Sequence, residues 1–517
     1  MVCAVDHLAA EAGGAMLRGG GTAADAAVAT SAVLAVTCQH LCGMGGDLFA
    51  VVHSGDGSPL ALNASGRAGS GADPARLRAE GHHEMPPFGD ARSVPVPGCV
   101  DGWLALHQRF GRLDLAAVLE PARSYAEDGF PASPTLAASV AMIAHLPEAG
   151  DYTVGGRLAA GAIVRRPGVA RTLAAIARDG RSASYRGEFG AALLALGAGE
   201  YVEADLARPQ ADWVPALEAS AWGHRLWTAP PNSQGYLTLA AASIADRLAL
   251  PEDPDDPLWA HLLIEAARQA GHDRPAVLHE QADGAALLAP GRLAPRRDAI
   301  DPERSAPLGQ PVAAGDTIAL CVVDDERWGV SLVQSNAAGF GSLLAVPGVR
   351  IFLQNRGIGF SLTPGHPAEY GPGRRPPHTL SPTVVTSDDG RLRAVAGTMG
   401  GDSQPQILLQ LLTRLLAARQ SPGRAVAAGR WALARAADAA GSTIGFDTWK
   451  SGGRIDVRLE GQAPATWDQG LRQRGHTVVR EAPFNDGFGH SHLIAVEPTH
   501  LAGATDPRPR AGGVSAR

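Results

Sequence analysis

The fold is decided by one stretch of this 517-residue chain, Gly315-Asp316-Thr317-Ile318-Ala319-Leu320-Cys321-Val322-Val323-Asp324-Asp325. Between Thr317 and Val323 the residues are apolar on both faces of a strand. A strand of this kind has to be covered by other material above and below. We therefore expect a layered α/β fold, in which residues 317–323 and 328–335 form a hairpin.

Two interpretations are open for Thr317, which begins this strand. It is an ordinary strand former, since β-branched residues pack well on a pleated surface. Alternatively it is a nucleophile that becomes useful after the chain is cut before it. Residues 281–316, which lead up to it, contain closely spaced Pro and Arg with little apolar periodicity. We interpret them as a mobile linker.

The composition predicts a protein with a large core. The chain is 45% hydrophobic and 19% charged, which excludes a disordered protein. Its net charge of -7 argues against a general nucleic-acid binder, which would carry a basic surface. The five cysteines form no CxxC pair, and neither a signal peptide nor an apolar run of about 18 residues is visible. We expect a cytoplasmic protein without a membrane span.

Periodicity along the chain predicts the remaining elements. Helices are expected at 6–18, 22–36, 99–110, 236–249, 404–418 and 423–440, with mostly helical structure over 114–260. Strands are expected at 48–52, 60–63, 349–354, 382–386, 392–397, 454–458, 476–480 and 492–496. The tail from residue 505 carries Asp506-Pro507-Arg508 and is then expected to be disordered.

Familiar catalytic and metal-binding patterns are weak in this sequence. It contains no G-x-S-x-G serine elbow. His490-x-His492 and His82-His83-Glu84 are the suggestive metal clusters, and neither has a third ligand at a recognisable spacing. We expect no metal and no cofactor.

Short motifs follow one another in a definite order along the whole length of the chain. They are residues 8–13, 20–29, 43–46, 66–67, 96–98, 127–131, 316–317, 322–324, 330–332, 334–335, 340–342, 375–376, 380–383, 400–401 and 506–508. Each motif alone is weak, but their order is specific. In this order they resemble the gamma-glutamyltranspeptidase family, whose members are autoprocessing N-terminal nucleophile hydrolases.

The resemblance implies a four-layer αββα sandwich made as one precursor. By analogy, the cut lies between Asp316 and Thr317, giving a large subunit of residues 1–316 and a small subunit of residues 317–517. The freed α-amine has a reference pKa of about 7.7–8.0, so a neutral fraction can act as base for the hydroxyl.

The resemblance also implies roles for further residues. Gly400 and Gly401 match the backbone N–H pair of an oxyanion hole. Ser335 matches a hydroxyl that steadies the amine of the nucleophile. Arg67 matches the arginine that holds a substrate carboxylate, and His378 and Thr379 stand in the place of a Ser-Ser pair that touches the same carboxylate.

The sequence departs from the family where the substrate's α-ammonium would bind. The acidic residue expected there falls at Gly359, and Arg356 brings a cation instead. The segment with Asn355 and Arg356 is similar to the oxamate amidohydrolase branch of the family, which implies that Asn355 contacts the substrate. We interpret Arg356 equally as a substrate contact or as a loop arginine bonded to a neighbouring carboxylate or carbonyl.

Three hypotheses follow. The first is an amidohydrolase acting on a small amide that bears a carboxylate, such as oxamate, through an acyl–Thr317 intermediate. The second is a gamma-glutamyltransferase or glutathione hydrolase. The third is an inactive binding module that keeps the fold, for which Ile318 and Ala319 after the nucleophile leave room.

Overall fold

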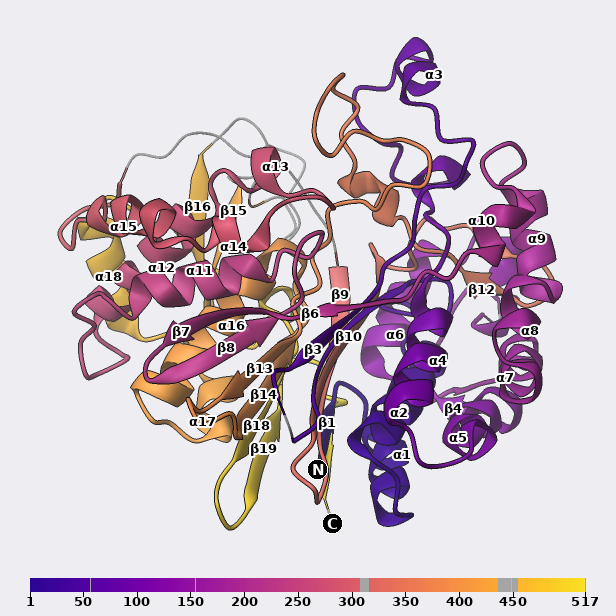
Figure 1. The fold of residues 1–517 in the computed structure, drawn as a ribbon, viewed down its shortest axis with the longest axis horizontal. Helices are drawn as coiled ribbons and strands as arrows, with labels where there is room; N and C mark the ends of the chain where they lie inside the picture. The colour runs from indigo at the N-terminus through magenta and orange to yellow at the C-terminus, as the bar shows by residue number, and fades with distance from the viewer. Residues whose placement is uncertain (56, 154, 307–315, 436–447, 449–453, 517) are drawn as a thin grey trace.

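A computed structural model describes residues 1–55, 57–153, 155–306, 316–435, 448 and 454–516. Two antiparallel sheets lie face to face at its centre (Figure 1). The first has the order β20 (Gly513–Ser515), β1 (Val2–Ala4), β9 (Asp316–Val323), β10 (Gly329–Ala337), β2 (Asp47–His53), β3 (Leu60–Ala64) and β6 (Asp212–Pro215). The second has the order β19 (Leu501–Thr505), β18 (Ser491–Val496), β14 (Leu392–Thr398), β13 (Thr383–Thr386), β8 (His224–Thr228) and β7 (Leu217–Ala221).

Small residues bring the two sheets close together. A Cβ atom placed on Gly397 of β14 would lie 2.9 Å from Cβ of Ala319 on β9, so this glycine permits the close approach. Ser331 of β10 links the sheets with hydrogen bonds, since its Oγ donates to the carbonyl of Ala396 at 2.8 Å and accepts from the N–H of Thr383 at 3.1 Å. The relative position of β9 and β14 is therefore fixed by both packing and polar contacts.

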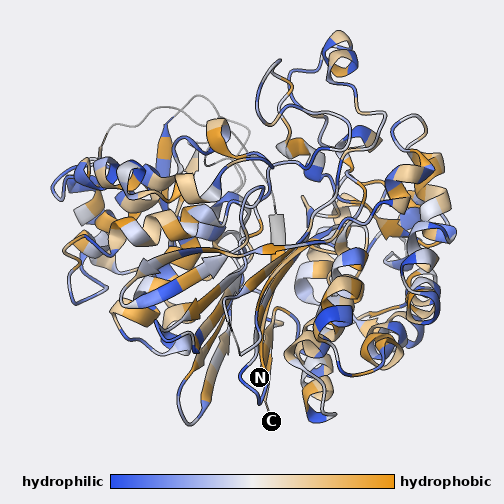
Figure 2. Cartoon of the chain, viewed as in Figure 1, coloured by the Kyte–Doolittle hydropathy of each residue, from blue (hydrophilic) through white to orange (hydrophobic). Residues whose placement is uncertain are grey.

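Helices cover the outer face of each sheet (Figure 1). The first sheet packs against α1 (His7–Arg18), α2 (Ala23–Thr37) and α4 (Cys99–Phe110), and α5 (Leu115–Asp128) packs on α2. The second sheet packs against α11 (Tyr236–Ala245) and α16 (Gln404–Leu412), and α12 (Pro257–Gly271) packs on both of these helices. Hydrophobic residues concentrate on the central strands (Figure 2). The predicted four-layer αββα sandwich is confirmed.

The other elements surround these four layers. The helices are α3 (Pro74–Ala79), α6 (Pro134–Ser139), α7 (Pro167–Asp179), α8 (Arg181–Tyr185), α9 (Glu188–Leu196), α10 (Glu203–Ala207), α13 (Arg274–Val277), α17 (Pro422–Ala427) and α18 (Ala465–Gln473). The short strands are β4 (Phe130–Pro131), β5 (Ile163–Val164), β11 (Ala345–Val346), β12 (Ile351–Phe352), β15 (Trp431–Arg435), β16 (Ile455–Leu459) and β17 (Val478–Arg480). None of the helices in the described part of the chain is both long and apolar enough to cross a membrane.

The helix predicted at 423–440 is wrong. Helix α17 ends at Ala427, and Trp431–Arg435 form strand β15, which pairs with β16. Trp431 and Leu433 are fully buried there, so tertiary packing overrides the helix propensity of the alanines. The end of the predicted helix, residues 436–440, lies outside the described residues.

Three other predicted segments also differ in the structure. Residues 212–228, expected to be helical with the rest of 114–260, contain strands β6, β7 and β8. The strand expected at 349–354 is limited to the two residues of β12, and the helix expected at 404–418 continues beyond Leu412 as a π-helix over Thr413–Ala417. The boundaries of these elements depend on contacts with residues that are distant in sequence.

The predicted linker is ordered as far as residue 306. It contains α14 (Gly284–Leu287) and α15 (Pro290–Asp298), and Glu265 accepts a hydrogen bond from the N–H of Ala306 at 3.0 Å. Proline in the first turn is favourable for a helix, which a search for apolar periodicity does not register. Residues 307–315 lie outside the described residues, and the division into 1–316 and 317–517 stays a prediction.

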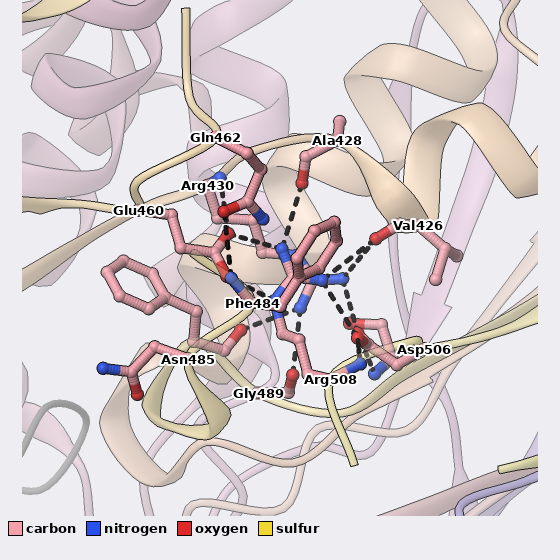
Figure 3. A network of polar contacts seen from close by, with 12 residues as sticks. Val426, Ala428, Arg430, Glu460, Gln462, Phe484, Asn485, Gly489, Asp506 and Arg508 are labelled. Atoms are coloured by element: carbon pink, nitrogen blue, oxygen red, sulfur yellow. Dashed lines mark hydrogen bonds and ion pairs between the residues drawn. The ribbon is translucent and has the colours of Figure 1, made fainter. Parts of the chain in front are cut away.

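The prediction of a disordered C-terminal tail is wrong. β20 pairs with β1, and Asp506 and Arg508 are buried in a charge network with Arg430 and Glu460 (Figure 3). Arg508 Nε donates to Glu460 Oε1 at 2.7 Å, and Arg430 Nη2 donates to Asp506 Oδ2 at 2.7 Å. Two positive and two negative side chains balance each other, which satisfies the requirement that buried charges be paired.

We expect Asp506→Ala to lower the free energy of unfolding by about 3–5 kcal/mol, because it leaves two buried arginines facing one carboxylate. Urea unfolding followed by circular dichroism measures the change. Asp389→Ala is the control, since Asp389 pairs with Arg391 on the exposed surface and its loss should change stability little. Equal effects of the two substitutions would contradict the observed burial of the tail.

Candidate active site

Thr317 is the second residue of β9, beside a bulge in the neighbouring strand. Ile318 pairs with Gln334 of β10, and Asp316 pairs with Ala337. Two residues of β10, Ser335 and Asn336, therefore oppose Thr317 alone. Bulges of this kind redirect side chains and are frequent next to active sites. The backbone thus brings Ser335 next to Thr317, and the role of Ser335 in steadying the amine stays a prediction.

The Gly400–Gly401 turn lies at the Thr317 end of β9. Strand β14 starts at Leu392, near the end of β9 that is farthest from Thr317. A Cβ atom on Gly329, which pairs with Val323 at that end, would lie 2.7 Å from the side chain of Leu392. Strand β14 reaches Ala319 at Gly397, so the residues that follow approach the first residues of β9. Gly400 and Gly401 have φ of +135° and +53°, conformations that favour glycine.

The carbonyls of this glycine pair are held by defined donors. The carbonyl of Gly400 accepts from the N–H of Ser403 at 2.9 Å, and that of Gly401 accepts from Nε2 of Gln234 at 2.9 Å. Gly401 also opens a short 3-10 helix, and the first N–H groups of a helix have no partner within it. The turn can therefore present N–H donors toward a developing oxyanion.

Arg356 links two other predicted site residues. Its guanidinium donates to Oγ of Ser335 and to Oγ1 of Thr379, both at 3.1 Å, and its exposed fraction is 1%. The buried cation of Arg356 is thus hydrogen-bonded to Ser335, which lies opposite Thr317 in the neighbouring strand. These contacts are with the hydroxyls of Ser335 and Thr379, and the substrate contact of Arg356 stays a prediction.

Asp47, which the sequence analysis did not select, holds the site together. Its carboxylate is fully buried and accepts three hydrogen bonds, from the N–H of Gly66 at 2.8 Å, Nε2 of Gln354 at 2.8 Å and Nε2 of His378 at 3.1 Å. Asp47 also pairs across the strands with Ser335. The available signal was a charged residue that opens an otherwise apolar strand after two glycines.

His378 is neutral in this environment. Burial, and next the positive charge of Arg356, lower the pKa of His378 to about 3. With the Nε2 proton directed at Asp47, the Nδ1 atom accepts from the N–H of Leu380 at 3.4 Å. The ring is fully buried and packs edge-on against Phe49. His378 therefore acts here as a fixed spacer between Asp47 and the Thr379 segment.

Arg67 has one half of its guanidinium engaged. Nη2 forms an ion pair with Asp212 at 3.0 Å, and Asp212 also pairs with Arg375 at 2.8 Å. The Nη1 atom is buried and has no hydrogen-bond partner among the described residues. A buried donor without a partner is costly, so an incoming carboxylate oxygen would relieve an unsatisfied group.

Asn355 and Gln234 shape the site through the backbone. Asn355 donates to the carbonyl of Pro87 at 2.8 Å and accepts from the N–H of Ala338 at 2.9 Å. Gln234, just before α11, donates to the carbonyls of Thr379 and Gly401 at 3.0 and 2.9 Å. It therefore ties the Thr379 segment to the glycine turn. The substrate contact predicted for Asn355 stays a prediction.

One cluster with metal-ligand chemistry lies away from this site, at His261, Glu265 and His476. His261 Nδ1 and His476 Nε2 are 2.8 Å apart and share a hydrogen bond, while Glu265 binds Arg268 and the N–H of Ala306. The donor atoms of this cluster are occupied by one another and by the backbone. A guanidinium beside the carboxylate also disfavours a cation there.

Comparison with known proteins gives consistent results. A model of the gamma-glutamyltranspeptidase family matches residues 9–516. The oxamate amidohydrolase proenzyme of Klebsiella pneumoniae is 35% identical, covering 98% of this chain and 97% of that protein. The glutathione hydrolase-like YwrD proenzyme of Bacillus subtilis is 33% identical, with the same coverage of the two chains. Among solved structures, a cephalosporin acylase from Bacillus halodurans has a TM-score of 0.88 at 32% identity, covering 99% of this chain and 94% of that chain.

We expect Asp47→Asn to lower kcat/KM by about 100-fold on an amide that the unaltered protein hydrolyses, because three loops lose their common acceptor and the groups they carry shift. Steady-state kinetics measure the loss.

Asp25→Asn is the matched control for this substitution. Asp25 is equally buried and accepts from the N–H groups of Thr22 and Arg112 at 2.9 Å, but it lies at the opposite end of α2. We expect it to reduce stability and leave kcat/KM unchanged. An equal kinetic loss in both variants would show that Asp47 acts through stability alone.

Proposed function

The chain belongs to the gamma-glutamyltranspeptidase family, and from this premise we propose that it is an autoprocessing amidohydrolase that cleaves the amide of a small carboxylate-bearing substrate, oxamate-like in its chemistry. As a member of this family it is an enzyme of the hydrolase and transferase type. The observation that carries the substrate assignment is the pair of arginines, Arg67 and Arg356, at the site.

In the first step the precursor cuts itself. The hydroxyl of Thr317 attacks the carbonyl carbon of Asp316, and the peptide nitrogen leaves as the new α-amine of Thr317. The resulting ester between the Asp316 acyl group and Oγ is hydrolysed by water, which restores the hydroxyl. The products are chains 1–316 and 317–517, which stay associated.

In the second step the freed nucleophile turns over substrate. The neutral α-amine of Thr317 accepts the proton of its own hydroxyl, and Oγ attacks the substrate amide carbonyl. The N–H groups of Gly400 and Gly401 stabilise the oxyanion. The leaving amine takes the proton, and water then releases the acid from Thr317. Ser335, held by Arg356, positions the amine.

The substrate class follows from charge. The unpaired half of Arg67 suits a carboxylate oxygen, whereas the cation of Arg356 would repel an α-ammonium. Gly359, where an acid would be expected, leaves no space for one, since a Cβ there would lie 2.6 Å from the carbonyl of Pro377. The name of the Klebsiella relative agrees with a substrate that places a carboxylate next to an amide.

The competing proposal is hydrolysis or transfer of gamma-glutamyl amides. The name of the Bacillus subtilis relative and that of a Pseudomonas aeruginosa glutathione hydrolase proenzyme, 28% identical over 99% of this chain, favour it. It requires a partner for the α-ammonium of the glutamyl group. The positions of Gly359 and Arg356 argue against that partner.

Denaturing electrophoresis tests processing. We expect the purified protein to migrate as two chains and Thr317→Ala to migrate as one chain of the full 53.3 kDa, because alanine has no hydroxyl to attack the carbonyl. Thr317→Ser is the control, since it keeps a hydroxyl and should still be cut. An unaltered protein that remains a single chain would refute the proposal.

An ammonia-release assay on oxamate, run beside a gamma-glutamyl anilide assay, tests the substrate. We expect turnover of oxamate alone, and a KM for it raised about 10- to 100-fold in Arg67→Met, because a charged hydrogen bond is worth roughly 1.5–3 kcal/mol. Arg123→Met is the control, since Arg123 pairs with Glu120 on the outer surface of α5. Anilide turnover without ammonia release would support the competing proposal.

A further inference from the structure

We propose that the buried charge network of Arg430, Glu460, Asp506 and Arg508 positions the oxyanion-binding turn at Gly400–Gly401, and so belongs to the catalytic apparatus although it touches no substrate. This inference rests on the proposed function. Figure 3 shows the network, which joins the C-terminal tail to segments from three other parts of the chain.

The network holds the backbone of the segment Phe488–Ser491 through three hydrogen bonds. Arg430 Nη1 donates to the carbonyls of Phe488 at 2.8 Å and Gly489 at 3.1 Å. The carboxylate of Asp506 accepts from the N–H of Ser491 at 2.8 Å. Because Arg430 also donates to Asp506, one ion pair holds both sides of this segment.

Arg508 and Glu460 fix the ion pair from behind. Arg508 binds Glu460 through two nitrogens and donates to Asp506 Oδ1 at 2.9 Å, while the N–H of Arg430 donates to Glu460 Oε2 at 3.0 Å. Burial opposes ionisation of Asp506, but the positive charges of Arg430 and Arg508 outweigh it and hold its pKa well below the ordinary value. Asp506 therefore stays ionised and paired with both arginines at neutral pH.

The segment Phe488–Ser491 lies directly against the start of the glycine turn. The N–H of Met399 donates to the carbonyl of His490 at 3.2 Å, and Ser491 Oγ donates to Thr398 Oγ1 at 3.0 Å. A Cβ on Gly489 would lie 2.5 Å from the carbonyl oxygen of Met399. Residues 398–399 thus have no room to shift unless residues 489–491 shift with them.

The position of this contact matters because Met399 immediately precedes Gly400. The N–H groups of Gly400 and Gly401 must point at the oxyanion, and a displacement of about 1 Å costs a catalytic group much of its effect. Glycine at φ of +135° and +53° can move to other conformations at little steric cost, so the neighbouring residues must keep the turn in this one. The network contributes that support from residues 430–508, which follow the turn in sequence.

The test compares two glycine substitutions at positions with positive φ and extended ψ. Gly489 has φ of +84° and ψ of 161°, and Gly180, between α7 and α8, has φ of +60° and ψ of -140°, but a Cβ on Gly180 meets no atom within 4 Å. We expect Gly489→Ala to lower kcat about 10- to 100-fold with KM changed less than about twofold, because it pushes Met399 and displaces an oxyanion donor. Gly180→Ala should lower Tm through backbone strain alone and leave both constants unchanged.

A second variant acts from the other side of the contact. Arg430→Lys keeps one positive charge but cannot donate to Phe488, Gly489 and Asp506 together. We expect the same fall in kcat at constant KM in this variant, and it serves as the test if Gly489→Ala does not fold.

The outcomes separate this inference from the proposed function. If Gly489→Ala and Arg430→Lys keep the kcat of the unaltered enzyme while Thr317→Ala abolishes turnover, the inference is wrong and the proposed function stands. If KM rises and kcat does not fall, the network supports substrate binding instead, and the inference is also wrong. A processed protein that hydrolyses no amide would overturn both.

Discussion

The architecture of the site depends on one fully buried carboxylate, Asp47. A charge without water must be surrounded by donors, and its three donors come from segments far apart in sequence, at Gly66, Gln354 and His378. Each donor is the immediate neighbour of a predicted substrate-binding residue: Arg67, Asn355 or Thr379. A single electrostatic requirement therefore brings the three segments that face the substrate to one place.

A second constraint sets the relative position of Thr317 and the Gly400–Gly401 turn. The two sheets approach closely because Gly397 and Ala319 are small, and Ser331 bonds across the interface. With β9 and β14 fixed in this way, Thr317 and the Gly400–Gly401 turn meet at one edge of the sandwich. The strand of the proposed nucleophile and the proposed oxyanion turn belong to different sheets, so their relative geometry is a property of the layered fold.

Sequence reasoning succeeded where a residue's own surroundings carry the signal. The strand at Thr317–Val323 was evident because it is apolar on both faces. The roles of Ser335, Gly400 and Arg67, which family motifs imply, stay predictions. Sequence reasoning failed for Trp431–Arg435, whose strand depends on pairing with β16, and for Asp506, whose partners lie at Arg430 and Arg508. Asp47 was missed because its importance lies in donors up to 331 residues away.

The first sheet alternates strands from the two proposed subunits, residues 1–316 and 317–517, so the subunits cannot separate by sliding past each other. β1, from the beginning of the chain, lies between β20 and β9, both of which follow the proposed cut. β10 is paired in turn with β2. Two mature molecules could not exchange subunits without first breaking ladders on both sides of β1. A cut precursor is thus committed for its lifetime to the partner with which it folded.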